Sequence, residues 1–249
     1  MGTYAAVVLA GGAARRMGGV DKPALPVGGR SMRDRVLAAV GDAAPRVLVG
    51  PGGGVTDGVR VTREDPPGGG PVAATAAGLA LLDPDTTLVA LLAADLPLLT
   101  RAAIGDLLDH LAPPVAARPD SLSSPQALAG SPASAAPAGS LSSQRAPADN
   151  PSGRRVGAVP DREWPADGVC FVDANGRRQS LCGVWRVEAL RAGLLRLAAE
   201  RGGSLAGASM RALFAGLAIR EVPWAGDGPP PWFDCDTDED VRRAEEWVR

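Results

Sequence analysis

The chain has 249 residues, of which 45% are hydrophobic and 4% aromatic, which is enough to bury the core of one α/β domain. Its 26 Lys and Arg against 28 Asp and Glu give a net charge of −2, and no long run of like charge occurs. This argues against general nucleic-acid binding and a polybasic membrane anchor, and no apolar run approaches the roughly 18 residues of a transmembrane helix.

Short apolar segments alternate with helical patterns in the first half of the chain. Tyr4–Leu9 is an apolar run that ends in glycines, as a buried parallel strand does where it enters a loop. Further strands are expected at Arg46–Val49, Val59–Thr62 and Thr87–Leu92, with helices capped by Ser31, over Val72–Leu82, and over Arg101–Leu111 after Thr100. This alternation predicts an α/β fold: a single doubly wound, mainly parallel, Rossmann-like sheet whose ligand lies beyond the carboxyl ends of the strands.

Residues 119–152 interrupt this pattern. The stretch from Pro119 to Ser152 is rich in Ser, Ala, Pro and Gly and contains no aromatic residue, so it cannot bury enough surface to offset its ordering entropy. We therefore expect one domain over residues 1–249, interrupted at about 119–152 by a disordered insertion in a surface loop.

The pattern of short elements resumes after the insertion. Val169–Val172 and Arg178–Trp185 are predicted to form a hairpin that turns at Asn175-Gly176. Helices are expected over Val187–Arg201 and Ser209–Gly216, a strand over Ile219–Val222, and a last helix capped by Asp236 or Thr237.

The most informative stretch is the glycine-rich segment from Leu9 to Lys22. Adjacent glycines let backbone N–H groups approach phosphate oxygens, and Arg16 and Lys22 add positive charge for a triphosphate. The segment is neither a GxGxxG loop nor a P-loop, which disfavours oxidoreductases and P-loop NTPases. Lys22 is the only lysine among the 26 Lys and Arg residues, which indicates a need for a compact ammonium there. The alternative is a glycine-rich connection with two solvated basic residues.

Asp95 is the candidate ligand for a metal ion. It follows the most apolar predicted strand, where a carboxylate suits a hard cation such as Mg²⁺; the alternative is a turn cap before Pro97. Asp234 and Asp236 are further candidate ligands, although Asp236 could also serve only as a helix cap. The sole histidine, His110, falls at the end of a predicted helix, so general-base chemistry by histidine is not expected.

These motifs resemble those of one family. Leu9–Lys22 closely resembles the LAGGxxxRMGGxDK signature of molybdenum cofactor guanylyltransferases, within the NTP-transferase-like α/β proteins. The resemblance extends to Glu64-Asp65, Gly70-Pro71, Ala94-Asp95-Leu96-Pro97 and Phe233–Thr237. It implies that nucleotide is bound by Leu9, Ala10, Gly11, Gly12, Lys22, Asp65 and Asp95, with Mg²⁺ on Asp95. One departure concerns Gly50, because the family often places an asparagine beside the guanine directly after the second strand.

The resemblance implies transfer of GMP from GTP to the molybdopterin-bound molybdenum cofactor, with release of pyrophosphate. Arg16, Lys22 and Asp95 are the expected catalytic residues, and Mg²⁺ is the expected cofactor. The attacking phosphate is already anionic, so the chemistry needs positioning and charge neutralisation rather than a base. The partners would be GTP, a phosphorylated pterin-type acceptor and possible molybdoenzyme or cofactor-biosynthesis proteins. The alternatives are a nucleotidyltransferase that uses CTP or another acceptor, and a catalytically inactive nucleotide-binding module.

Cysteine usage bears on the compartment. Cys170, Cys182 and Cys235 lie far apart in sequence and include no CxxC pair, so a structural zinc site is not expected. An odd number of cysteines is more consistent with reduced thiols. We therefore expect a cytoplasmic protein.

Overall fold

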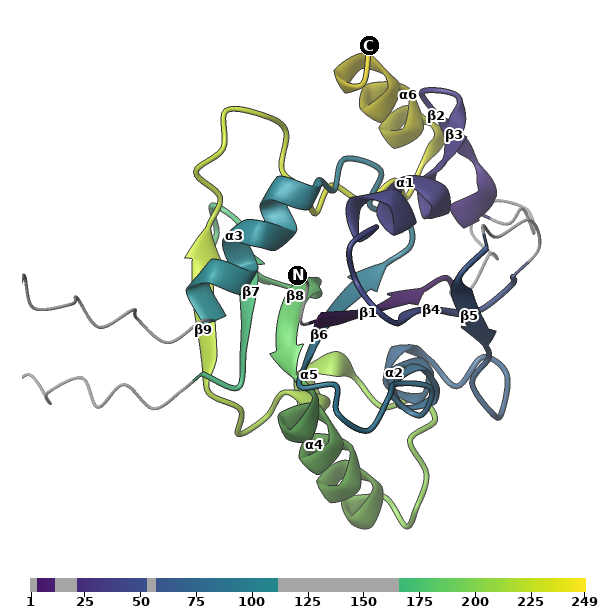
Figure 1. The fold of residues 1–249 in the computed structure, drawn as a ribbon, viewed down its shortest axis with the longest axis vertical. Coiled ribbons are helices and arrows are strands. Elements are labelled where there is room, and N and C mark those ends of the chain that lie inside the picture. The colour runs from purple at the N-terminus through teal and green to yellow at the C-terminus, as the bar shows by residue number, and fades with distance from the viewer. Residues whose placement is uncertain (1–3, 12–21, 53–56, 112–165) are drawn as a thin grey trace, which may run out of the picture. The chain divides into compact units, whose positions relative to one another are not determined.

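The computed structural model describes residues 4–11, 22–52, 57–111 and 166–249 (Figure 1). These residues belong to one structural unit, Met1–Pro113 with Glu163–Arg249. The predicted insertion at about 119–152 lies outside the described residues, so its disorder and the single-domain assignment stay predictions. Among the described helices, none is long and apolar enough to cross a membrane.

A seven-stranded sheet forms the centre of the fold, in the order β5-β4-β1-β6-β8-β7-β9. Its strands are β1 (Tyr4–Leu9), β4 (Arg46–Val49), β5 (Val59–Thr62), β6 (Leu88–Ala93), β7 (Gly168–Val172), β8 (Arg178–Arg186) and β9 (Ile219–Pro223). Neighbouring strands pair in parallel except at β8, which runs antiparallel to both β6 and β7. The predicted doubly wound, mainly parallel α/β fold is therefore confirmed.

Helices cover both faces of the sheet because its central strands are apolar on both sides. In β1, Ala6 and Val8 belong to one buried cluster, whereas Ala5 and Val7 belong to the cluster on the opposite face. Helices α1 (Met32–Ala39) and α3 (Arg101–Leu111) pack on the first face, and α2 (Pro71–Leu79), α4 (Val187–Glu200) and α5 (Met210–Leu213) on the second (Figure 1).

A third, smaller cluster supports the end of the sheet where the site lies. It joins Val27, Met32, Leu98, Cys235 and Ala244 under α6 (Asp238–Trp247). The adjoining elements are a 3-10 turn, η2 (Lys22–Ala24), and a small antiparallel ribbon of β2 (Pro26–Val27) and β3 (Arg30–Ser31). Through this packing, the C-terminal segment and the segment after the glycine-rich loop meet at one end of the molecule.

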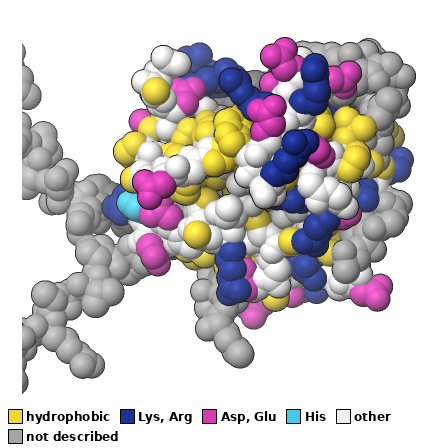
Figure 2. Space-filling model, turned by 90° about the horizontal axis from the view of Figure 1, so that it is seen from above, with side chains coloured by type: hydrophobic (Ala, Val, Ile, Leu, Met, Phe, Trp, Pro, Cys, Tyr) yellow, Lys and Arg dark blue, Asp and Glu magenta, His cyan; other side chains and the backbone are white. Residues whose placement is uncertain are grey.

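Helix-capping residues lie where the sequence predicts them. The Ser31 hydroxyl accepts a hydrogen bond from the first turn of α1, and the Thr100 hydroxyl does the same for α3. Thr237, and not Asp236, caps α6. The three cysteines are buried free thiols. Figure 2 shows basic and acidic side chains interspersed over the face that it presents.

Candidate functional site

A cavity of about 1250 Å³ opens at the carboxyl edge of the parallel strands. The strand order β5-β4-β1-β6 places β4 and β5 on one side of β1 and β6 on the other, so the chain changes winding direction between β1 and β6. Ligands of doubly wound sheets bind at such a switch point. The described lining residues include Leu9, Ala10, Gly11, Lys22, Gly50, Arg63, Glu64, Gly68, Gly70, Asp95, Asp173, Arg177, Gln179, Trp232, Asp234 and Asp236.

The segment that follows β1 forms one wall of the cavity. Leu9, Ala10 and Gly11, the nucleotide contacts that the resemblance implies, all line it. Gly12 and Arg16 lie outside the described residues, and their predicted roles stay predictions.

Gly50, at the end of β4, packs directly against this segment. Its backbone has a φ of +138°, and a Cβ atom there would lie 2.9 Å from the carbonyl carbon of Ala10 and 3.1 Å from the nitrogen of Gly11. Its N–H donates to the carbonyl of Thr62 at 2.8 Å, and the Ala10 N–H donates to that of Val49 at 2.8 Å. No side chain fits at position 50 without moving the loop, so this chain requires glycine where the family often has asparagine.

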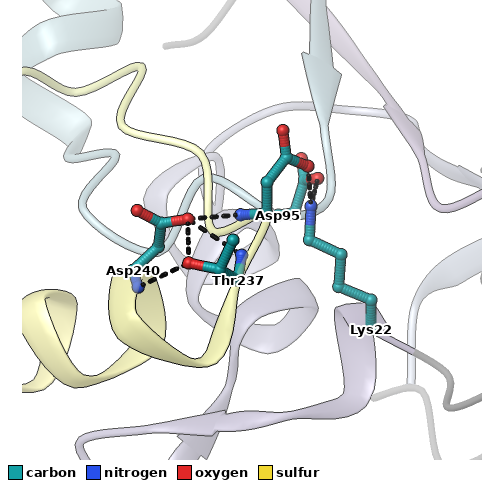
Figure 3. A network of polar contacts seen from close by, with 5 residues as sticks. Lys22, Asp95, Thr237 and Asp240 are labelled. Carbon is teal, nitrogen blue, oxygen red and sulfur yellow. Dashed lines mark hydrogen bonds and ion pairs between the residues drawn. The ribbon is translucent and has the colours of Figure 1, made fainter. Parts of the chain in front are cut away.

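Lys22 lies between two carboxylates at the centre of the site (Figure 3). Its Nζ is 2.7 Å from Asp95 Oδ2 and 2.7 Å from Asp236 Oδ1, although the three residues are far apart in sequence. Burial by itself lowers the pKa of Lys22, but the hydrogen bonds to Asp236 and Asp95 outweigh it and raise the pKa above its ordinary value. The lysine is therefore charged near neutral pH and holds both carboxylates at one point.

The α6 cap leaves the Asp236 carboxylate free for this role. Asp240 Oδ2 accepts hydrogen bonds from the backbone N–H groups of Asp236 at 3.1 Å and Thr237 at 2.8 Å, and the Thr237 hydroxyl accepts from Asp240 N (Figure 3). The hydrogen bond from Thr237 lowers the pKa of Asp240. Since Thr237 and Asp240 complete the capping box, Asp236 is held in place by its backbone and points its side chain to Lys22.

A third carboxylate makes this part of the cavity acidic. Burial, followed by the nearby charges of Asp236 and Asp95, raises the pKa of Asp234. The N–H of Cys235 donates to the Asp95 carbonyl at 3.3 Å, which ties the C-terminal segment to the end of β6. The structure thus brings together Asp95, Asp234 and Asp236, the three carboxylates that the sequence marked as candidate metal ligands.

The carboxylates of Asp95 and Asp236 could supply part of the coordination of a magnesium ion, with substrate phosphates supplying the rest. Among the described residues, no group of three or more His, Cys, Asp or Glu is arranged to hold a metal ion by itself, and this includes Asp95, Asp234 and Asp236. Mg²⁺ is commonly held by one or two carboxylates together with substrate phosphates and water. Two carboxylate oxygens that converge on one cation, as Lys22 shows here, suit that mode.

The acidic pair after β5 divides between the cavity and the surface. Glu64 is 9% exposed and lines the cavity, whereas Asp65 is exposed and is not among the described lining residues. Glu64 Oε1 accepts a hydrogen bond from the N–H of Gly68 at 3.1 Å. The sequence interpretation chose Asp65 and missed Glu64, although both belong to the matching motif; the predicted role of Asp65 stays a prediction.

The β7–β8 hairpin supplies the opposite end of the cavity, through Asp173, Arg177 and Gln179. Asp173 Oδ1 accepts from the N–H groups of Asn175 and Arg177, each at 2.9 Å, so the aspartate organises the turn. The hairpin itself is confirmed, with Gly176 at a φ of +74°. Sequence reasoning missed its place in the site, because which strands meet at the switch point depends on pairing between distant segments.

Fold and site together define a nucleotidyltransferase-type α/β protein, with a glycine-ended first strand and a lysine held by carboxylates from two distant segments. The chain belongs to the MobA-like NTP transferase domain family, whose model matches residues 6–216. This match confirms the family resemblance that begins at Leu9–Lys22, and the protein is a nucleotidyltransferase. No curated protein is significantly similar to the chain in sequence.

Solved structures share this fold at low sequence identity. The molybdopterin-guanine dinucleotide biosynthesis protein A of Archaeoglobus fulgidus is 16% identical with a TM-score of 0.59, covering 97% of this chain and 96% of that one. The 4-diphosphocytidyl-2C-methyl-D-erythritol synthase of Anaerococcus prevotii is 12% identical with a TM-score of 0.57 and 99% of each chain covered. The 2-C-methyl-D-erythritol 4-phosphate cytidylyltransferase of Thermus thermophilus is 16% identical, with a TM-score of 0.56 and 98% of each chain covered. These likenesses support the fold.

Proposed function

We propose that this protein transfers GMP from GTP to the phosphate of a molybdopterin-type cofactor and releases pyrophosphate. The observation that carries the proposal is the contact of Lys22 with Asp95 and Asp236, at 2.7 Å each, inside the cavity at the switch point. One cation and two carboxylates at this place suit a reaction in which a polyphosphate and a divalent cation are bound together.

The proposed reaction needs charge neutralisation more than proton transfer. An oxygen of the acceptor phosphate forms a bond to the α-phosphorus of GTP, and the bond from that phosphorus to the pyrophosphate leaving group breaks. Lys22 stays protonated and neutralises charge on the phosphates, while Asp95 and Asp236 would hold Mg²⁺. When bound, the metal ion supplies electrostatic stabilisation of the phosphate oxygens.

The two ends of the cavity suit the two substrates. Leu9–Gly11, Gly50 and Glu64 lie at the ends of β1, β4 and β5 and suit the nucleotide. Arg177 and Gln179 line the hairpin end beyond Asp95 and suit an anionic acceptor. The Arg177 guanidinium can pair with a phosphate at this end of the cavity.

The direct test measures pyrophosphate release by the full-length protein with each of GTP, CTP, ATP and UTP, in the presence of Mg²⁺ and molybdopterin. We expect release with GTP and molybdopterin together, and a fall of about 100-fold or more when Asp95 is changed to asparagine. Arg242→Gln, at an exposed position on α6 outside the lining, is the matched control and should keep its activity. Absence of release with every nucleotide, from protein that binds them, would favour an inactive nucleotide-binding module instead.

Use of CTP is the alternative with an observation in its favour. Two of the similar solved structures are named as cytidylyl enzymes, and Gly50 offers no side chain to a guanine base. Equal kcat/KM values for CTP and GTP would leave nucleotidyl transfer standing and remove the guanylyl assignment.

A further inference from the structure

Glu64 is a buried carboxylate at the nucleotide end of the cavity whose second oxygen has no donor among the described residues. The residue is 9% exposed, and its Oε1 is held at 3.1 Å by the Gly68 N–H. A Cβ built on Gly11 would lie 3.4 Å from Oε1 and 3.7 Å from Oε2, so the carboxylate faces the loop after β1. The second oxygen, Oε2, is open to the cavity and can accept hydrogen bonds from donors of a ligand there.

The neighbouring strand cannot supply a base-reading side chain. Gly50, at the end of β4, is closed to any Cβ by the backbone of Ala10 and Gly11. The next strand along the sheet is β5, and Glu64 follows it into the same cavity. The carboxylate of Glu64 is therefore placed to perform the recognition that position 50 cannot perform.

We propose that Glu64 selects guanine by accepting hydrogen bonds from the N1–H and N2–H groups of the base. A carboxylate has two acceptor oxygens and no donor, so it suits a base edge with two adjacent donors. Guanine presents such an edge. Adenine and cytosine each place a ring acceptor beside their amino group, and uracil has a single N–H between two carbonyls. The inference rests on the proposed nucleotidyl transfer and names the residue that determines its nucleotide specificity.

The spacing of the strands agrees with this placement. Glu64 follows β5 and Asp95 follows β6, and three strand spacings of about 4.8 Å put the two strands about 14 Å apart. A nucleotide that lies along the edge of the sheet would have its base at Glu64 and its phosphates beside Lys22 and Asp95. The hairpin end of the cavity then stays open for the acceptor.

Glu64 could instead serve only to hold its own loop through Gly68. The change Glu64→Gln separates the two roles, because glutamine keeps an acceptor oxygen for the Gly68 N–H but replaces the other acceptor with an amide donor. Loss of loop order would weaken all nucleotides alike, whereas loss of base reading would weaken GTP selectively.

The experiment measures dissociation constants of GTP, ITP and CTP with Mg²⁺ by calorimetry, without any acceptor. ITP lacks the N2 amino group of GTP, so wild-type protein should bind GTP about tenfold or more tightly than ITP. In Glu64→Gln the GTP affinity should fall by about tenfold or more, and the ratio of GTP to ITP affinity should approach one. Glu188→Gln, at an exposed position on α4, is the matched control and should match wild type.

Three results would overturn the inference: equal wild-type affinities for GTP and ITP, a GTP/ITP ratio that Glu64→Gln leaves unchanged, or an equal loss for all three nucleotides. The wild-type comparison needs no variant, so it decides the matter even if Glu64→Gln does not fold. Because no acceptor is present, these outcomes are independent of the transferase assay. Selective GTP binding without transfer would refute the proposed function and leave the base reading intact.

Discussion

Replacing Lys22 tests the charge arrangement of the site most directly. Lys22→Ala removes two contacts of 2.7 Å and leaves Asp95 and Asp236 facing each other, with Asp234 nearby. The side chains of Lys22, Asp95 and Asp236 are 17%, 25% and 56% exposed, so solvent weakens both ion pairs. At about 0.5 to 1 kcal/mol for each pair, the variant should lose about 1 to 2 kcal/mol of stability without metal.

This loss corresponds to a fall in melting temperature of about 2 to 8 °C for a chain of this size. Adding Mg²⁺ should recover part of the loss in Lys22→Ala, because the cation neutralises the carboxylates that the lysine leaves unpaired. Transfer should fall by about 100-fold or more, as it does when one preorganised charge or donor is removed from a reaction centre.

Lys22→Arg separates charge from shape. It keeps the positive charge and should melt within about 2 °C of wild type, yet its planar fork cannot occupy the position of a compact ammonium between two carboxylates. We expect transfer to remain impaired in this variant. Calorimetric melting with and without Mg²⁺, combined with pyrophosphate release, measures both quantities. Near wild-type transfer by Lys22→Arg, or an unchanged melting temperature of Lys22→Ala without metal, would refute the reasoning.

Three further variants test two other positions of the site and one buried hydrogen bond at the start of β1. Asp95→Asn should lower Mg²⁺-dependent pyrophosphate release by about 100-fold or more with little change in melting temperature; full activity would reduce Asp95 to a turn cap. Gly50→Ala should cost about 1 to 3 kcal/mol in calorimetric unfolding and weaken GTP binding, because its Cβ would lie 2.9 Å from Ala10, whereas wild-type affinity would show that the loop yields freely. Tyr4 donates to Asp42 Oδ1 at 2.8 Å, and burial, then this bond, raises the tyrosine pKa. The folded state thus keeps a proton that the unfolded chain releases above about pH 10, so the free energy of unfolding falls as the pH rises further. Unfolding measured against pH should show a shallower fall for Tyr4→Phe than for wild type. An equal slope of unfolding free energy against pH in the two proteins would contradict this.

The strands of the nucleotide half could be read from the sequence because their signal is local. β1, β4 and β5 begin and end at the predicted residues, as does α3, since apolar runs and helical spacing are bounded there by turn or capping residues. The β2–β3 ribbon was missed because strands of two residues are too short to show a pattern. The position of β8 between β6 and β7 was also missed, because it depends on pairing between segments that are distant in sequence.

The residues of the candidate site likewise include some that could be predicted from the sequence and some that could not. Lys22 and Asp95 could be singled out from composition and from their place after predicted strands, and the structure brings them together. The choice between Glu64 and Asp65 could not be made from sequence, because successive residues of an extended chain point in opposite directions and the turn after β5 sets which one faces inward. Side chains beyond a strand end therefore need the loop geometry before they can be assigned.

The surroundings of Lys22 give a physical reason for a lysine, rather than an arginine, at this position. An ammonium group has three rotatable donors on a flexible stem, so it can contact two carboxylates from different segments and then turn to a phosphate. A guanidinium presents its donors in a fixed plane, so its partners must lie in that plane. Asp95 follows β6 and Asp236 precedes α6, so the fold sets the backbone positions of both carboxylates, while the lysine reaches them on a flexible stem. In the proposed reaction that freedom lets Lys22 balance the carboxylates before the nucleotide binds and the phosphates afterwards, a change of partner that the rigid fork of arginine could not make.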